Sequence, residues 1–163
     1  MSLLKSRIGS YYMVKLIKTS NHLHLTIIRF TLAIVIGMHG MQKLIGAFGG
    51  HGIAWTMAKF YEWFNIPPYL TAIVIFTESI GMISLLFGFL TRLWSILVIV
   101  IMVAAVYLLH YKIGFFMNWY GSNSGEGFEY HVLIIAMCSS LFIWGGGRYS
   151  FDYLTYNIIE NYN

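Results

Sequence analysis

One acidic residue lies deep inside an apolar stretch of this sequence. Glu78 follows Tyr69 by about nine residues, so at 1.5 Å per residue of helix it would lie roughly 14 Å below a membrane surface. An isolated carboxylate at that depth is costly, so it must be protonated or paired. The functional interpretation is a carboxylate that handles protons or binds a ligand. The structural interpretation is a buried ion pair, or a neutral acid that fixes the register of its helix.

Other polar residues gather toward one side of the predicted membrane. A single outward-facing pocket could collect six side chains from several helices: His39, Lys43, Glu78, His110, Glu129 and His131. Glu129 and His131 are two residues apart and point about 200° from each other on a helix, so they cannot both face one pocket squarely. No two of these histidines lie at i and i+4 on one helix, so we predict no compact metal site. A dispersed His/Glu site shared among helices stays open.

Three charged residues near helix ends carry predictions of their own. Lys43 and Glu129 both lie at outer helix ends, where a half-desolvated ion pair is much stronger than one in water, so we expect them to pair. Arg29 lies about four residues inside the opposite boundary. We expect it either to snorkel to the surface or to bind the anionic head group of a lipid or partner.

The composition requires a membrane around these groups. Hydrophobic residues make up 58% of the 163 residues and charged residues only 10%, whereas soluble domains carry about 25% charge. A soluble fold of this size could not bury so much apolar surface, which excludes an ordinary cytoplasmic enzyme, a disordered regulator and a nucleic-acid module. The single Cys138 excludes an intramolecular disulfide and a four-cysteine zinc site. The sequence therefore predicts an integral membrane protein in contact with lipid.

Four segments are apolar enough to cross a bilayer, which takes about 20 residues of helix. They cover roughly residues 25–44, 69–90, 93–111 and 130–144. The very short link between the second and third makes them antiparallel neighbours. Small residues at helical spacing on the first two, such as Gly37, Gly40 and Gly81, favour close helix contacts. The predicted fold is an all-α, integral membrane four-helix bundle.

The distribution of Lys and Arg orients this bundle. With the N-terminus inside, seven basic residues fall on the inner side and three on the outer side, as the positive-inside rule requires. The predicted topology is N-in/C-in, with a cytoplasmic arm at 1–22, a membrane domain at 23–152 and a cytoplasmic tail at 153–163. Residues 50–64 carry apolar side chains at helical spacing and precede Pro67-Pro68. They predict an amphipathic helix in the outer interface between spans one and two.

Several short motifs recur in order along the chain. They are Arg29; His39-Gly40-x-Gln42-Lys43-Leu44 with Gly46-x-Phe48-Gly49-Gly50; Glu78 with Gly81; Gly88-Phe89-x-Thr91-Arg92; Gly127-Phe128-Glu129-Tyr130; and Gly145-Gly146-Gly147 with Ser150-Phe151-Asp152. Taken in that order, they resemble the DoxX family of small bacterial membrane proteins. The resemblance covers roughly residues 25–152, with a mild departure at Phe151, where Leu is expected.

The resemblance implies a four-helix protein of the bacterial inner membrane. Some members of the family are subunits of thiosulfate:quinone oxidoreductases, and others associate with redox or thiol-handling partners. The sequence has no nucleophile elbow, phosphate loop, haem-attachment motif or dinucleotide fingerprint. No flavin or iron–sulfur ligands are evident either, so a redox role would need a quinone or a cofactor-bearing partner.

Three hypotheses about function stay open. The first is a quinone-linked redox subunit, in which Glu78 is the catalytic residue and a quinone head group or small anion is bound by Arg29, His39, Gln42, Lys43 and Glu129. The second is a non-catalytic scaffold, possible as a homo-oligomer, that docks partner proteins. The third is a carrier for a small solute or metal ion. Whether the chain is an enzyme at all stays open with them.

Overall fold

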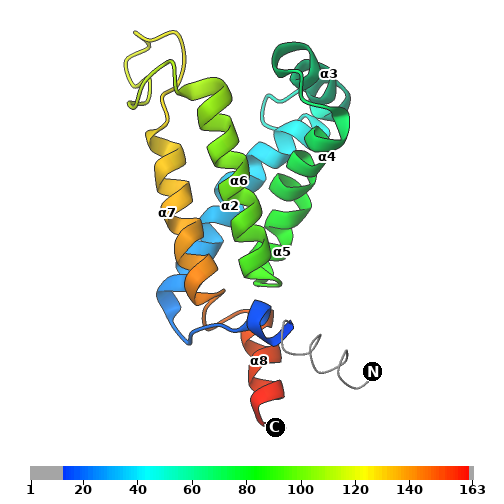
Figure 1. Cartoon of the computed structure of the whole chain (residues 1–163), viewed down its shortest axis with the longest axis vertical. Coiled ribbons are helices and arrows are strands. Elements are labelled where there is room, and N and C mark those ends of the chain that lie inside the picture. The colour runs from blue at the N-terminus through cyan, green and yellow to red at the C-terminus, as the bar shows by residue number, and fades with distance from the viewer. Residues whose placement is uncertain (1–12, 162–163) are drawn as a thin grey trace, which may run out of the picture.

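The computed structural model describes residues 13–161, and this part of the chain consists of helices and loops without a strand (Figure 1). The helical elements are α2 (Leu23–Ile45), α3 (Gly52–Phe64), α4 (Pro68–Phe76), η1 (Thr77–Gly81), α5 (Met82–Phe87), α6 (Thr91–Ala105), η2 (Val106–His110), α7 (Glu129–Trp144) and α8 (Phe151–Asn161). The two η elements are π-helical turns. Residues 1–12 of the predicted N-terminal arm and residues 162–163 of the tail lie outside the described residues.

Among the described residues, three helices are long and apolar enough to cross a membrane: Leu23–Ile45, Pro68–Phe87 and Thr91–His110. The second runs through α4, η1 and α5, and the third through α6 and η2. These bounds agree with the first three predicted spans to within a few residues. The fourth predicted segment is also a helix, α7, but its 16 residues make it a shorter apolar helix than the others. The chain is therefore an all-helical, multi-pass membrane protein.

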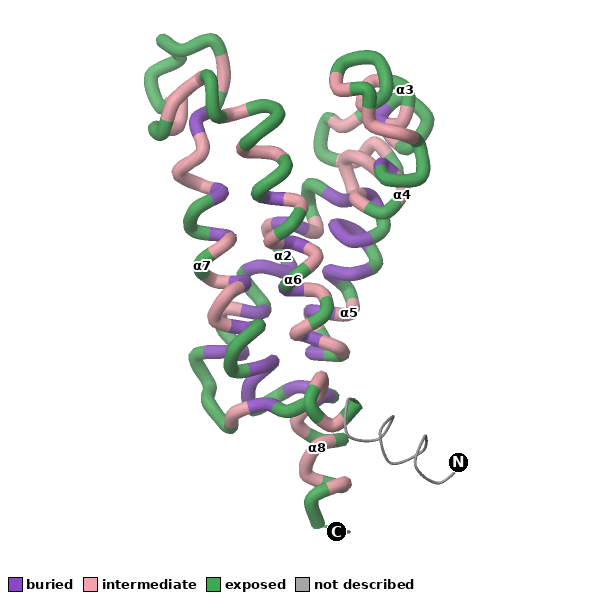
Figure 2. The backbone as a smooth tube through the Cα atoms, viewed as in Figure 1, coloured by how far each residue is buried: buried purple, intermediate pink, exposed green. Residues whose placement is uncertain are grey.

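The core lies where α2 crosses the other long helices. Buried apolar side chains come from α2, α5, α6 and α7, among them Leu32, Met82, Val98 and Ile134. The outward faces of the same helices carry exposed apolar side chains, as expected for surfaces in contact with lipid (Figure 2). The described helices thus have one apolar face buried in the core and another apolar face exposed toward the bilayer.

Glycines set how closely the helices approach. A Cβ atom at Gly40 of α2 would overlap the backbone carbonyl of Glu78 in η1. A Cβ atom at Gly81 would lie 2.6 Å from the ring of Trp94 on α6. Backbones can meet at this distance only where no side chain intervenes. The small residues predicted to line helix contacts do so at these two positions.

Arg29 joins the helices at the end of the bundle that carries α8, which we call the α8 end. Its side chain is fully buried. It donates hydrogen bonds to the carbonyls of Gly146 at 3.0 Å and Leu85 at 2.9 Å, and also to those of Leu86 and Tyr149. The prediction that Arg29 snorkels or meets a head group is wrong, because four backbone carbonyls already surround its guanidinium.

Asp152 closes the same end from α8. Its two carboxylate oxygens accept hydrogen bonds from the backbone N–H groups of Leu90 and Thr91, each at 2.8 Å. These are free N–H groups at the start of α6, so a residue far along the chain caps that helix. Burial raises the pKa of the Asp152 carboxyl above its ordinary value, and the hydrogen bonds from Thr91 and Leu90 oppose that rise.

Candidate functional site

A cavity of about 550 Å³ opens at the other end of the bundle, which we call the α3 end. In Figure 1, α3 and α4 stand apart from α6 and α7 at this end, with α2 passing behind them. Most of the lining is apolar, supplied by α3, α4 and α6. The polar lining residues are His39, Lys43, Glu78, His110, Glu126, Tyr130 and His131. A mostly apolar cavity with a few convergent polar groups is typical of a small-molecule site.

An ion pair lies in the wall of this cavity. The ammonium of Lys43, in the last turn of α2, donates a hydrogen bond to the carboxylate of Glu78 in η1. The Glu78 side chain is 5% exposed and that of Lys43 is 24% exposed, so the pair is shielded from water on one side and faces the cavity on the other. A carboxylate buried in an apolar wall thus keeps a counter-charge at its side.

This pairing corrects a prediction. Lys43 was expected to pair with an acid, and it does, but the acid is Glu78 and not Glu129. Glu129 instead accepts a hydrogen bond from the indole Nε1 of Trp119 at 3.3 Å. The depth of Glu78 was counted from the start of its own helix. Gly40 lies directly against the Glu78 backbone, so α2 and the helix that carries Glu78 are offset along their axes. The Lys43 side chain therefore reaches the level of Glu78.

Both π-helical turns contribute to the cavity. Glu78 lies in η1 and His110 in η2. A π-turn places one extra residue in a helix, which turns the following side chains relative to the preceding ones, and such turns occur frequently at functional sites. Without these insertions the two residues would point in other directions from the same helices.

Aromatic and imidazole rings form a cluster on the α7 side of the cavity. The rings of His110 and His131 lie 4.3 Å apart between centroids, and those of His39 and Tyr130 lie 6.3 Å apart. His110 Nδ1 lies 2.7 Å from the carbonyl oxygen of Glu126. A carbonyl oxygen only accepts, so Nδ1 carries the proton and Nε2 of a neutral His110 is an acceptor.

Two buried polar atoms of this cluster lack a hydrogen-bond partner among the described residues. They are the phenol oxygen of Tyr130 and Nδ1 of His131. Buried polar atoms are rarely left unpaired, because the loss of water around them goes uncompensated. Both residues line the cavity, so a polar group held there would complete their hydrogen bonding.

The predicted pocket is therefore assembled in part. His39, Lys43, Glu78, His110 and His131 come together in the cavity. Glu129 does not line it, in agreement with the expected divergence of Glu129 and His131 on one helix. Gln42 does not line it either, because it donates to the carbonyl of Phe48 at 3.1 Å and so supports the turn after α2. Arg29 lies at the α8 end.

Two lining residues were missed. Tyr130 lies next to His131 in the first turn of α7, and the structure places both side chains on the cavity. Glu126 comes from the loop between η2 and α7, where no periodicity indicates a direction. Among the described residues no group of three or more His, Cys, Asp or Glu side chains could hold a metal ion.

Several apolar residues that line the cavity are also exposed. Leu70 and Ile73 of α4, Val100 of α6 and Leu108 of η2 line the cavity, and all four are exposed apolar side chains. The α4 and α6 walls of the cavity are therefore formed by apolar side chains that are not covered by other parts of the described chain.

Comparison with known proteins gives one match. A family model described as DoxX matches residues 24–111, which run from α2 to the end of η2 and include both partners of the ion pair. No curated protein matches this chain. No solved structure matches it either.

Proposed function

This chain belongs to the DoxX family, and we propose that it is a quinone-binding membrane subunit of a redox system. The observation that carries the proposal is the cavity at the α3 end, which is mostly apolar, has exposed apolar side chains on α4 and α6 and contains unpaired polar atoms. Proteins that act on small anions need a polar entrance. Entry between α4 and α6, past these apolar side chains, instead favours a ligand with a long apolar tail.

The residues of the cavity fit a quinone head group. Such a head group is a flat ring with two carbonyl acceptors, and a cavity of about 550 Å³ has the size of ordinary ligand sites. The phenol of Tyr130 is an unpaired donor for one carbonyl. The ammonium of Lys43 keeps further N–H groups beyond the one directed at Glu78, and it faces the same space.

The proposed roles of the residues follow from these positions. Glu78 holds the Lys43 ammonium in the cavity. Tyr130 and Lys43 orient the head group, and His39 closes the site beside Tyr130. The tilted rings of His110 and His131 line the cavity beside Glu126, so their imidazoles are the groups that would exchange protons with a bound head group. A bound quinone would supply two-electron, two-proton acceptor chemistry, with electrons from a cofactor-bearing partner.

The proposed topology places this site on the outer side of a bacterial inner membrane. The first described residues and α8 both lie at the α8 end (Figure 1), which supports an even number of crossings. We infer four spans, N-in/C-in, with α7 as the fourth. The α8 end also carries Lys18, Arg92 and Arg148, as the positive-inside rule requires of an inner side.

Helix α3 is proposed to lie in the outer interface. Trp55 and Trp63 on it are exposed and pack edge to face, and Lys59 lies over the Trp63 ring. Exposed tryptophans are enriched where a membrane meets water. Phe60 and Phe64 of the same helix line the cavity, so α3 would cover its outer edge.

Quinone retention by the purified protein tests the proposal. The full chain would be extracted in a mild detergent and its bound quinone measured by mass spectrometry, against an empty-detergent control from the same membranes. Wild type should retain about one quinone per chain. Tyr130→Phe removes one hydrogen bond and should weaken binding about fivefold, while Tyr120→Phe, in an exposed loop, should leave it unchanged.

A folded wild-type protein without quinone above the control would overturn the proposal. If it retained its fold and instead co-purified with a partner protein, the scaffold hypothesis would replace it. Retention of a small solute or metal ion would support the carrier hypothesis.

A further inference from the structure

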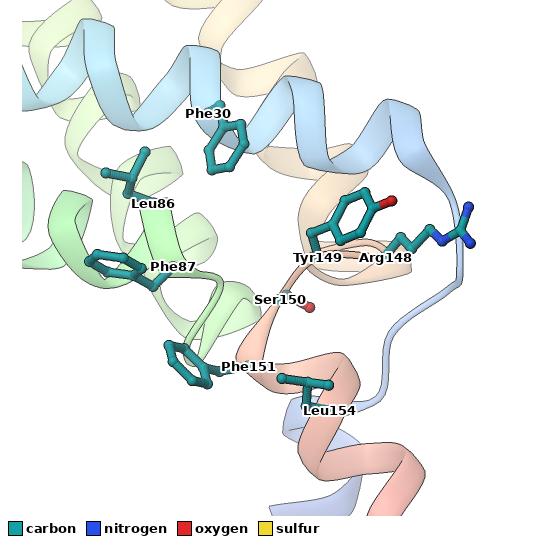
Figure 3. A pocket seen from close by; sticks show the side chains of 8 residues that line it. All are labelled: Phe30, Leu86, Phe87, Arg148, Tyr149, Ser150, Phe151 and Leu154. Carbon is teal, nitrogen blue, oxygen red and sulfur yellow. The ribbon is translucent and has the colours of Figure 1, made fainter.

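A second hollow lies at the α8 end, outside the site described above. It is a groove of about 560 Å³ between α2, α5 and α8 (Figure 3). Its walls are the side chains of Phe30, Leu86, Phe87, Phe151 and Leu154. Arg148 and Tyr149 lie at its exposed edge, beside the buried Ser150. The rings of Phe87 and Phe151 lie 6.4 Å apart and join α5 to α8 along one wall.

The exposed edge of this groove carries one cation, Arg148, whose guanidinium points outward, away from the apolar walls (Figure 3). The side chain of Arg148 is exposed, and it has no carboxylate partner among the described residues. It lies over the ring of Tyr149, 5.6 Å from the centroid. The acid closest in sequence, Asp152, is buried and its oxygens are occupied by backbone N–H groups. An anion at this edge would therefore meet Arg148 without competition from that carboxylate.

The groove also lies at the depth where lipid head groups begin. Phe87 is the last residue of the membrane-crossing helix Pro68–Phe87, and Phe30 lies on the exposed face of α2. Acyl chains surround such residues in a bilayer, so a soluble partner could not reach the walls. An exposed tyrosine at the edge of the groove is typical of the interface between acyl chains and head groups.

We propose that this groove binds one anionic phospholipid, with an acyl chain between α2, α5 and α8 and the phosphate on Arg148. The apolar walls give affinity for the acyl chain of the lipid, whatever its head group. Arg148 supplies the preference for an anionic head group. The site is independent of the proposed quinone cavity, which lies at the opposite end of the bundle.

Lipid titration of the full chain tests this assignment. Purified, delipidated protein in detergent would be titrated with phosphatidylglycerol or phosphatidylcholine, and bound lipid counted by native mass spectrometry. Wild type should bind one phosphatidylglycerol several-fold more tightly than phosphatidylcholine. Arg148→Gln should weaken phosphatidylglycerol binding about fivefold, the contribution of one basic residue near an anionic surface, and leave phosphatidylcholine binding unchanged.

Two further variants distinguish lipid binding in this groove from nonspecific electrostatic attraction between the protein and anionic lipid. Lys112→Gln removes the same charge from an exposed position at the α3 end and should change neither affinity. Leu154→Trp fills the groove from an exposed position on α8, so the fold should persist, as a melting curve would check, while binding of both lipids weakens.

The assignment is overturned if wild type binds the two lipids equally, or if Arg148→Gln and Lys112→Gln weaken phosphatidylglycerol binding alike. It is also overturned if folded Leu154→Trp binds phosphatidylglycerol like wild type.

Discussion

Lys43 and Glu78 show how two opposite charges persist among apolar helices. Each charge is tolerated because the other lies beside it and because the cavity leaves the lysine partly exposed. Removing one partner of such a pair is much more destabilising than removing both, because a single buried charge keeps its desolvation cost without the compensating attraction.

A double-mutant cycle on this pair follows directly. Glu78→Leu should lower the free energy of unfolding by about 3 kcal/mol, because the Lys43 ammonium loses its counter-ion. Lys43→Met combined with Glu78→Leu should recover most of that loss, since no charge remains. Unfolding in detergent measures all four forms. Losses that simply add would contradict a coupled pair.

Arg29 supports a second prediction about a single residue. Its planar guanidinium serves four carbonyls from two segments, and a lysine ammonium cannot match that geometry. Arg29→Lys should therefore lower the free energy of unfolding by about 2–4 kcal/mol, the value of one or two hydrogen bonds from a charged donor. The matched control is Arg148→Lys, at an exposed position. It should change the free energy of unfolding by less than about 0.5 kcal/mol. Equal effects in the two variants would refute the structural role of Arg29.

The sequence indicates which polar residues are unusual, but not which of them meet. Glu78, Lys43 and His39 stand out because they interrupt apolar runs, and the cavity collects all three. The partner of Lys43 could not be predicted, because depth counted along separate helices assumes that those helices start at one level. The surroundings of Arg29 depend on carbonyls of the segment 145–149, which the chain reaches more than 100 residues later.

At the scale of the elements, the contact between α2 and η1 positions the whole site. Gly40 lets the two backbones touch, which brings Lys43 within reach of Glu78. The π-turn at η1 then directs the carboxylate toward the cavity. The extents of the long helices could be predicted from their apolar runs. The π-turns could not, because an inserted residue leaves the apolar pattern nearly unchanged.

Two glycines of α2 give a matched test of this contact. Gly40→Ala places a Cβ atom into the Glu78 carbonyl and should lower the free energy of unfolding by about 1–3 kcal/mol, despite the better helix propensity of alanine. Gly37→Ala places its Cβ atom 3.5 Å from Met82, an ordinary contact, and should be neutral or stabilising. Under the proposed function, Gly40→Ala should also reduce the amount of quinone that co-purifies with the protein. A Gly40→Ala protein as stable as Gly37→Ala would contradict the close approach.

At the scale of the whole molecule, the proposed topology predicts opposite labelling of two exposed positions. Single cysteines would replace Ser122, in the loop before α7, and Thr155, on α8, in a Cys138→Ala background. An impermeant thiol reagent added to intact cells with a permeable outer envelope should label position 122 and not position 155. The reverse result would invert the topology, and labelling of both would mean that α7 does not cross the membrane.

The proposed entry of a ligand between α4 and α6 would change how the strength of ligand binding has to be expressed. A ligand that enters from lipid is in equilibrium with a thin two-dimensional reservoir, not with the surrounding water. Its local abundance is set by the mole fraction of ligand in the bilayer, and this fraction rises when the same amount is held in less lipid. Occupancy should therefore fall when vesicles are enlarged with inert lipid at constant total ligand, and stay constant when only the volume of buffer changes.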